Sequence, residues 1–169
     1  VAKYGADAVR YFLLREIPAM EDGDFSYEKF ETRYNADLAG GLGNLVARVT
    51  TLATKISNFQ FPISNQFLNP SFQKLLAEAK EKTEKALEQF QFNDALVAIW
   101  EVVHACDKYI DEKQPWKESS GQKEVIDDLL FAIAEIANLL RPFLPETSEK
   151  ILHQLQNGKG ESLFPRVGA

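Results

Sequence analysis

The sequence has little of what disulfide, metal or membrane chemistry requires. It contains one cysteine, Cys106, and two histidines, His104 and His153, which lie far apart along the chain. A single cysteine excludes an internal disulfide framework, and this set of residues lacks the spacing of a metal site. No apolar run reaches the length of a membrane span, and the N-terminus lacks the basic-then-apolar order of a signal peptide. We therefore expect a cytoplasmic protein with no metal ligands and no membrane partner.

Excess positive charge is also absent. The 169 residues include 25 Asp and Glu against 19 Lys and Arg, a net charge of −6. Nonspecific affinity for nucleic acid comes mainly from neutralising phosphates, so this balance argues against indiscriminate binding, and any nucleic-acid contact must be local. With 45% hydrophobic residues, the chain can bury the core of one ordinary domain. It starts at Val1 rather than at a methionine, and we expect it to be part of a longer chain.

Apolar residues recur at helical spacing along most of the sequence, and no stretch alternates as a strand does. Ser26, Asn93 and the pair Asn69-Pro70 are expected to begin helices, because Ser and Asn cap helix N-termini and Pro suits the first turn. The expected helices cover residues 7–16, 26–59 with an interruption near the glycines at 40–43, 70–90, 93–114, 125–140 and 146–155. The connectors are 19–24, 62–70 and 117–121. We predict an all-α fold, an antiparallel helix bundle with short connections.

One of these expected helices carries a line of polar side chains, which we call the polar stripe. It begins at Asn44, and its other members fall within about 40° of Asn44 at 100° per residue: Arg48, Thr51 and Lys55. Small residues at Gly40 and Ala47 flank the stripe and would let a flat group approach the backbone. The stripe therefore suits hydrogen bonding to a ligand, although a solvated helix face has the same pattern.

Trp116 follows Pro115, which cannot continue the preceding helix, so the indole is expected at a helix end. An exposed tryptophan in such a place suits stacking on a base, whereas the alternative is an aromatic ring folded back over the bundle. Hydrogen-bond donors combined with a stacking surface are what reading unpaired nucleic-acid bases requires.

Several motifs, in order along nearly the whole chain, resemble the C-terminal anticodon-binding part of the methionyl-tRNA synthetase family. They are Tyr4-Gly5-Ala6-Asp7 continuing to Glu16, Asp22-Gly23-Asp24-Phe25-Ser26, Asn35-Ala36-Asp37-Leu38, Leu42-Gly43-Asn44-Leu45, Tyr109-Ile110-Asp111-Glu112 with Pro115-Trp116, and Arg141-Pro142-Phe143-Leu144-Pro145. The resemblance implies a bundle of the class I synthetase anticodon-binding type. It also implies that residues 1–25 connect to a catalytic domain and that residues 26–169 form the anticodon-binding domain.

The family couples methionine to its tRNA with ATP and Mg, in a catalytic domain that would precede Val1. Neither the His-Ile-Gly-His-type nor the Lys-Met-Ser-Lys-Ser-type signature of that domain occurs here. The resemblance therefore implies no catalytic residue and no cofactor within this chain. The implied partners are methionine tRNA, through its anticodon loop, and the chain's own N-terminal catalytic domain.

The family's anticodon readers carry over onto Asn44, Arg48 and Trp116. Their implied task is recognition of the CAU anticodon, with the tryptophan stacking on the first base and the polar pair bonding base edges or backbone. Lys55 is a weaker addition as a phosphate or base contact. At Asp107 the family often has asparagine, which leaves a local hydrogen bond in doubt.

Two other functions fit the same residues. A helical protein-interaction module would use Trp116 and the polar stripe against a protein groove. An anticodon domain of another class I synthetase, for cysteine or leucine, would bind RNA with a different anticodon choice.

Overall fold

A computed structural model describes residues 3–17, 19, 22–56, 69–117 and 121–168, and within these ranges every regular element is a helix. The elements are α1 (Ala6–Glu16), α2 (Tyr27–Arg33), the π-helix η1 (Tyr34–Gly43), α3 (Asn44–Ile56), α4 (Pro70–Glu88), α5 (Phe92–Lys113), α6 (Gln122–Leu140) and α7 (Pro145–Asn157). The prediction of an all-α bundle is confirmed. None of the helices in the described ranges is long and apolar enough to cross a membrane.

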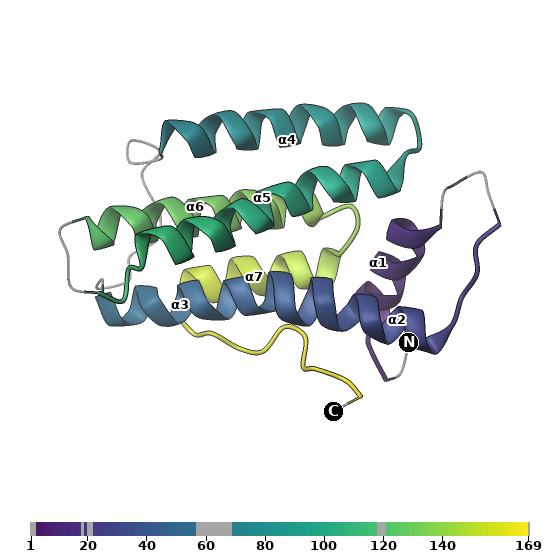
Figure 1. The fold of residues 1–169 in the computed structure, drawn as a ribbon, viewed down its shortest axis with the longest axis horizontal. Helices are drawn as coiled ribbons and strands as arrows, with labels where there is room; N and C mark the ends of the chain where they lie inside the picture. The colour runs from purple at the N-terminus through teal and green to yellow at the C-terminus, as the bar shows by residue number, and fades with distance from the viewer. Residues whose placement is uncertain (1–2, 18, 20–21, 57–68, 118–120, 169) are drawn as a thin grey trace.

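The helices stack in layers (Figure 1). α4 covers α5 and α6, and α3 and α7 lie on the opposite side of that pair, while α1 and α2 stand at one end. Each helix contributes buried apolar side chains to one core, among them Phe12, Leu45, Ile99, Ile133 and Ile151. Residues 158–168, which we call the tail, run back in extended form along α3.

Two of the three predicted helix starts are confirmed. The hydroxyl of Ser26 accepts a hydrogen bond from the Lys29 amide at 3.2 Å, and the side chain of Asn69 accepts one from the Ser71 amide at 2.9 Å. The prediction for Asn93 is wrong, because α5 already starts at Phe92. The Gln91 amide donates to the carbonyl of Ala86 at 2.8 Å. This bond closes the α4–α5 turn early, so the chain enters α5 without a side-chain cap.

The remaining helix ends lie within a few residues of the predicted ones. α5 stops at Lys113, where Gln114 adopts a left-handed conformation with φ 46°, and α7 stops at Gly158 with φ 68°. α6 starts at Gln122, three residues before the predicted start. The predicted helical residues 57–59, nearly all of the connector 62–70 and most of the turn 117–121 lie outside the described residues.

The interruption expected near the glycines is a change of helix type rather than a break. η1 spans the glycines, and its i→i+5 geometry places the carbonyl five residues earlier close to the side-chain position of Gly40 and of Gly43. A Cβ atom on Gly40 would lie 2.9 Å from the Asn35 carbonyl oxygen, and one on Gly43 would lie 2.9 Å from that of Leu38. Only glycine fits these two positions without a shift of the backbone.

The π-helix also keeps one buried stripe in line. Every fourth residue from α2 into α3 is buried: Phe30, Tyr34, Leu38, Leu42 and Val46. In a purely α-helical chain of 3.6 residues per turn, this spacing would drift by about 160° over its four steps. The wider turns of η1 reverse the drift, so all five side chains reach the same core.

We expect Gly43→Ala to lower the free energy of unfolding by ~1–3 kcal/mol, because the new methyl group must displace the Leu38 carbonyl. Gly41→Ala is the matched control, since a Cβ there meets its nearest atom, the Ala36 carbonyl oxygen, at 3.5 Å, an ordinary contact. That substitution should change stability by less than ~1 kcal/mol, in the stabilising direction that alanine's helix propensity favours. Equal effects of both substitutions in denaturant unfolding would contradict the close approach.

Candidate nucleic-acid interface

α3 separates its apolar and polar faces as its sequence pattern predicts. Its core-facing side chains are fully buried: Leu45, Val46, Val49 and Ala53. On the polar stripe, Asn44, Thr51 and Lys55 are exposed and Arg48 is half-buried. Because η1 ends at Gly43, Asn44 is the first residue of α3.

Trp116 lies in a turn held from both sides. The Lys117 amide donates to the Gln114 carbonyl at 2.9 Å, and the side-chain amide of Gln122, at the start of α6, donates to the Pro115 carbonyl at 2.9 Å. The Trp116 side chain remains 50% exposed. The turn that carries the ring is thus held by hydrogen bonds, and the ring lies at the surface, as a stacking platform requires.

The structure brings Trp116 and Arg48 together. They line one open hollow of about 470 Å³, which we call the tryptophan hollow, with Ala47, Thr51 and Leu52 as its remaining lining. The hydroxyl of Thr51 donates to the Ala47 carbonyl at 2.7 Å. Its hydrogen is therefore used within the helix, and Arg48 supplies the charged donor of this hollow.

Arg48 is paired with two carboxylates of α5. Its Nη2 lies 2.8 Å from Oδ1 of Asp111, and its Nη1 lies 3.5 Å from Oδ1 of Asp107. The Asp111 side chain is 67% exposed, whereas that of Asp107 is only 28% exposed. Asp111 can accordingly be exchanged for another anion, while Asp107 stays beside the guanidinium.

Asp107, where the sequence resemblance leads us to expect asparagine, is half-buried on α5. Burial raises the pKa of its carboxyl above the ordinary value of 3.8, with Arg48 opposing the rise and Asp111 adding to it. Its Oδ1 accepts no hydrogen bond from the described residues. Within the described ranges, Oδ1 of Asp107 thus meets Arg48 through a longer charge contact without a hydrogen bond.

Asn44 faces a second hollow of about 300 Å³, which we call the tail hollow. Its lining combines Asn44, Ala47 and Thr51 of α3, parts of η1 and the tail residues Glu161 and Arg166, among others. The Asn44 side chain makes no hydrogen bond to any described residue. Ala47 and Thr51 border both hollows, so the two lie next to each other along α3.

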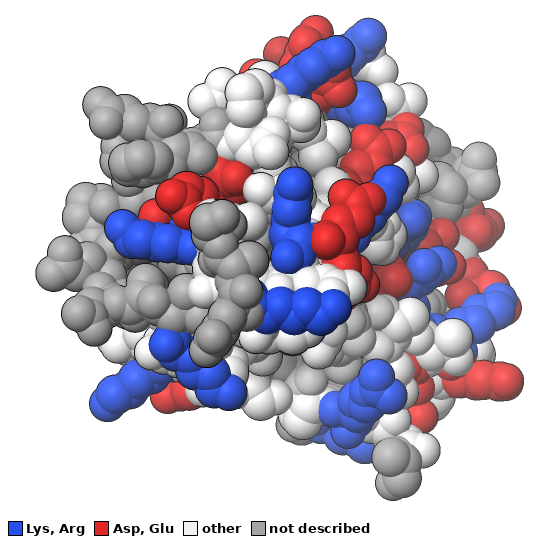
Figure 2. Space-filling model, turned by 60° about the vertical axis from the view of Figure 1, so that its left-hand side comes forward, with Lys and Arg blue, Asp and Glu red and all other residues white. Residues whose placement is uncertain are grey.

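Lys55 lies apart from both hollows. It is exposed in the last turn of α3, and within the described ranges it forms no ion pair. Figure 2 shows Lys and Arg side chains interspersed with Asp and Glu over this end of the molecule, rather than gathered in one basic patch. The surface charge therefore suits a few separate contacts.

Sequence reasoning missed Arg166 and the direct ion pair between Arg48 and Asp111. The spacing of Asp107 and Asp111 places both on one face of α5, but only the packing of α5 beside α3 shows which cation they meet. Arg166 belongs to the tail, which has no helical period. No sequence pattern linked it to Asn44, which lies more than 100 residues earlier.

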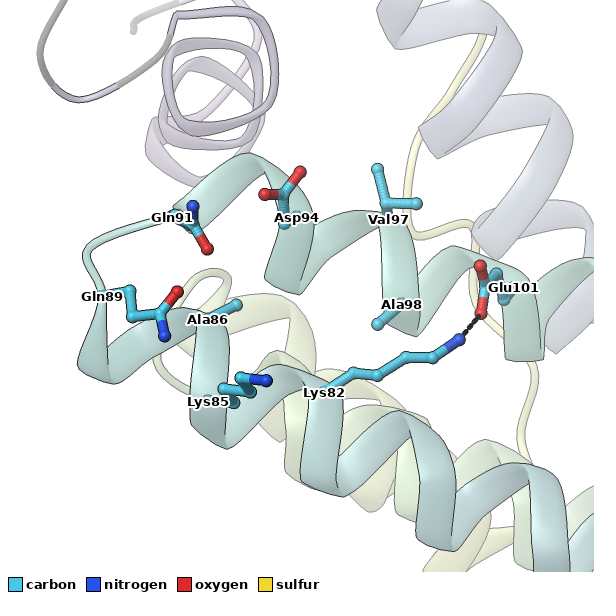
Figure 3. A pocket seen from close by; sticks show the side chains of 9 residues that line it. All are labelled: Lys82, Lys85, Ala86, Gln89, Gln91, Asp94, Val97, Ala98 and Glu101. Atoms are coloured by element: carbon cyan, nitrogen blue, oxygen red, sulfur yellow. Dashed lines mark hydrogen bonds and ion pairs between the residues drawn. The ribbon is translucent and has the colours of Figure 1, made fainter.

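Another hollow, of about 230 Å³, lies where α4 turns into α5 (Figure 3). Its Lys82 is paired with Glu101 at 2.8 Å, and none of the predicted site residues lines it. This hollow shares no lining residue with the tryptophan hollow or the tail hollow, so it is a separate feature of the surface.

The raised pKa of Asp107 predicts a pH-dependent effect of Asp107→Asn. Because the folded pKa exceeds the unfolded one, the ionised carboxylate weakens the fold at neutral pH, and this weakening disappears as the pH falls through the folded pKa toward 3.8. The variant should therefore be more stable than the wild type at pH 7, by a margin that shrinks toward pH 3.8.

Urea unfolding of both proteins across this pH range measures the margin. Asp111→Asn serves as the control, because it removes a partner of Arg48 without removing a buried charge. A margin for Asp107→Asn that does not change with pH would contradict the role of burial.

Two sequence families match the chain. Residues 71–166 match the anticodon-binding domain of tRNA ligase, and residues 1–50 match the class I tRNA synthetases of the (M) type.

Similar proteins cover nearly the whole chain. The methionine–tRNA ligase of Caldanaerobacter subterraneus subsp. tengcongensis is 37% identical, over 99% of this chain and 31% of its own length. That of Lactococcus lactis is 38% identical, over 92% of this chain and 25% of its own length. The apo crystal structure of Mycobacterium tuberculosis methionyl-tRNA synthetase superimposes with a TM-score of 0.82 at 29% identity, over 99% of this chain and 40% of that one. The chain thus spans 25% to 31% of the length of these two ligases.

Proposed function

This chain belongs to the family of anticodon-binding domains of tRNA ligases, of the methionyl-tRNA synthetase type, and we propose that it recognises the CAU anticodon of methionine tRNA. The observation that carries the proposal is the tryptophan hollow. It combines a half-exposed indole with a guanidinium over a floor that includes Ala47. An unpaired base needs these two things, a ring to stack on and a donor for its edge.

The stacking contribution comes from Trp116. Base–aromatic stacking contributes ~1–3 kcal/mol and does not discriminate strongly among bases. The indole therefore supplies affinity for the first anticodon base, and the neighbouring polar side chains supply the choice of base. Ala47 adds no side-chain bulk beyond its methyl group, so a flat ring can lie close to α3.

Arg48 can bind RNA when a base edge or a phosphate replaces Asp111 as the partner of its guanidinium. An ion pair with a carboxylate as exposed as that of Asp111 contributes ~0–1 kcal/mol, whereas a bidentate contact of arginine with a base contributes ~1–3 kcal/mol of discrimination. The exchange is therefore favourable for a well-placed base edge or phosphate. A poorly placed one leaves Arg48 with Asp111.

The proposal extends to a longer protein of which this chain would be the C-terminal part. One relative, the Mycobacterium tuberculosis synthetase, has been solved in complex with methionyl-adenylate. We assign ATP, Mg and methionine to a catalytic domain preceding this bundle, with residues 1–25 as its connection and residues 26–169 as the anticodon-binding domain. Lys55 would contact a phosphate beyond the two hollows. The complete protein would act in the cytoplasm as a methionine–tRNA ligase.

Titration of this chain with an anticodon stem-loop tests the proposal. The wild type should prefer a CAU loop over one altered at its first base. Trp116→Ala should weaken CAU binding by roughly 1–3 kcal/mol, and Trp116→Phe should recover part of that loss. Tyr27→Ala is the control, because Tyr27 is an aromatic side chain 70% exposed on α2. No preference among stem-loops would instead favour a protein-interaction module, and preference for another anticodon would favour a different synthetase.

Asn44 and Arg48 should show coupled effects, because they lie one helical turn apart and the two hollows that they line share Ala47 and Thr51. Each change to Ala should cost on the order of 1–3 kcal/mol in CAU binding, and the double variant should lose less than the sum. Arg48→Ala should also narrow the gap between CAU and the altered loop. Lys55→Ala is the control. It should weaken the binding of both loops equally if Lys55 contacts only phosphate. If the binding losses of Asn44→Ala and Arg48→Ala add strictly and the preference for CAU is unchanged in both, the polar stripe is only a solvated helix face.

A further inference from the structure

The tail is fastened to the bundle at several points. The side-chain amide of Asn35 donates to the Val167 carbonyl at 2.8 Å, and its oxygen accepts from the Val167 amide at 3.0 Å. The Tyr34 hydroxyl donates to the Pro165 carbonyl at 3.0 Å. Phe164 is buried, with its ring edge-on to that of Tyr34 at a centroid distance of 5.9 Å. The tail is therefore held in one conformation against η1.

The start of the tail lies close to α3. A Cβ atom on Gly160 would lie 2.8 Å from the Thr50 hydroxyl oxygen, so only glycine permits this approach. Gln154 of α7 adds a hydrogen bond from its side-chain amide to the Glu161 carbonyl at 3.0 Å. The backbone from 160 to 167 thus forms a fixed wall beside the N-terminal half of α3.

Arg166 is the cation that this wall presents. It stands between Pro165 and Val167, both of which are anchored, yet its side chain is exposed and forms no ion pair within the described ranges. It lines the tail hollow together with Asn44, whose side chain is also without a partner there. An unpaired guanidinium and an unpaired carboxamide therefore border one polar hollow.

We propose that the tail is the second wall of the anticodon site and that Arg166 binds a phosphate of the RNA backbone beside the nucleotide that Asn44 contacts. This inference rests on the proposed function. A guanidinium matches the oxygens of a phosphate with two parallel hydrogen bonds. Glu161 lines the same hollow and repels a second anion, which limits the contact to one phosphate.

The two hollows lie next to each other, so that they can hold two consecutive nucleotides of one strand. They share Ala47 and Thr51, so a base stacked on Trp116 has its neighbour's backbone beside the tail. In this arrangement the tryptophan hollow reads a base, and the tail hollow fixes the strand. Phosphate contacts set orientation and register and carry no sequence information.

Arg166→Ala tests the assignment in titrations of the full chain at several salt concentrations. The variant should bind the CAU stem-loop roughly 3- to 10-fold more weakly, as expected for one charge-assisted contact at a surface. The slope of log affinity against log salt should fall by ~0.7, the value for one phosphate on a single strand. The loss should be equal for CAU and for the altered loop. Arg141→Ala is the charge-matched control, because Arg141 is exposed at the end of α6 and lines neither hollow, and it should change neither quantity.

Asn35→Ala provides an independent test. It removes both hydrogen bonds that anchor the tail at Val167, and it leaves the Arg166 side chain itself unchanged. It should weaken binding, and the double variant with Arg166→Ala should lose less than the two single losses multiplied together. Thermal melting monitored by circular dichroism checks that each variant is folded.

The outcomes separate this inference from the proposed function. A wild type that prefers CAU, with Arg166→Ala behaving as Arg141→Ala does, overturns the inference alone. Weaker binding by Arg166→Ala with an unchanged salt slope shows that the arginine shapes the tail without meeting a phosphate, and also overturns it. A wild type without any preference for CAU overturns the proposed function, and the inference with it.

Discussion

The burial of one stripe of side chains from α2 to α3 is the constraint on which the rest of the structure depends. Phe30, Tyr34, Leu38, Leu42 and Val46 recur every four residues, and all five are buried. An α-helix drifts at this spacing, and the π-helix corrects the drift. The correction requires backbone carbonyls to approach Gly40 and Gly43 closely. The orientation of α3, and with it the direction of the polar stripe, follows from this one departure from α-helical geometry.

The candidate interface is assembled from parts that lie far apart in the sequence. α3 supplies the floor of the interface, the turn between α5 and α6 supplies the indole, and the tail supplies the opposite wall. Each part is held by hydrogen bonds outside the interface, through Gln122 for the turn and Asn35 for the tail. The backbone segments that carry the indole and the tail are therefore held by contacts outside the candidate interface.

Electrostatics at this surface favours discrimination over raw affinity. The chain is acidic overall, and two carboxylates of α5 accompany its best-placed arginine. Under the proposed function, a ligand must offer Arg48 a better partner than Asp111, which penalises badly placed anions as well as rewarding good ones. Asp107 lies beside the guanidinium, and its partial burial raises the pKa of its carboxyl. The interface thus relies on a few matched contacts.

The sequence by itself determined the helices and most of their ends, and it singled out the residues that we propose for recognition. Helical periodicity, Ser26, Asn69-Pro70 and Pro115 act through neighbours within one or two turns, so local rules suffice for them. The glycines at 40–43 marked a departure from the α-helix, although its type depends on which side chains the core must bury. Only the tertiary structure decided that Arg48 meets Asp111 and that Arg166 stands beside Asn44. Those partners come from other elements, and contacts between distant segments depend on how the whole core packs.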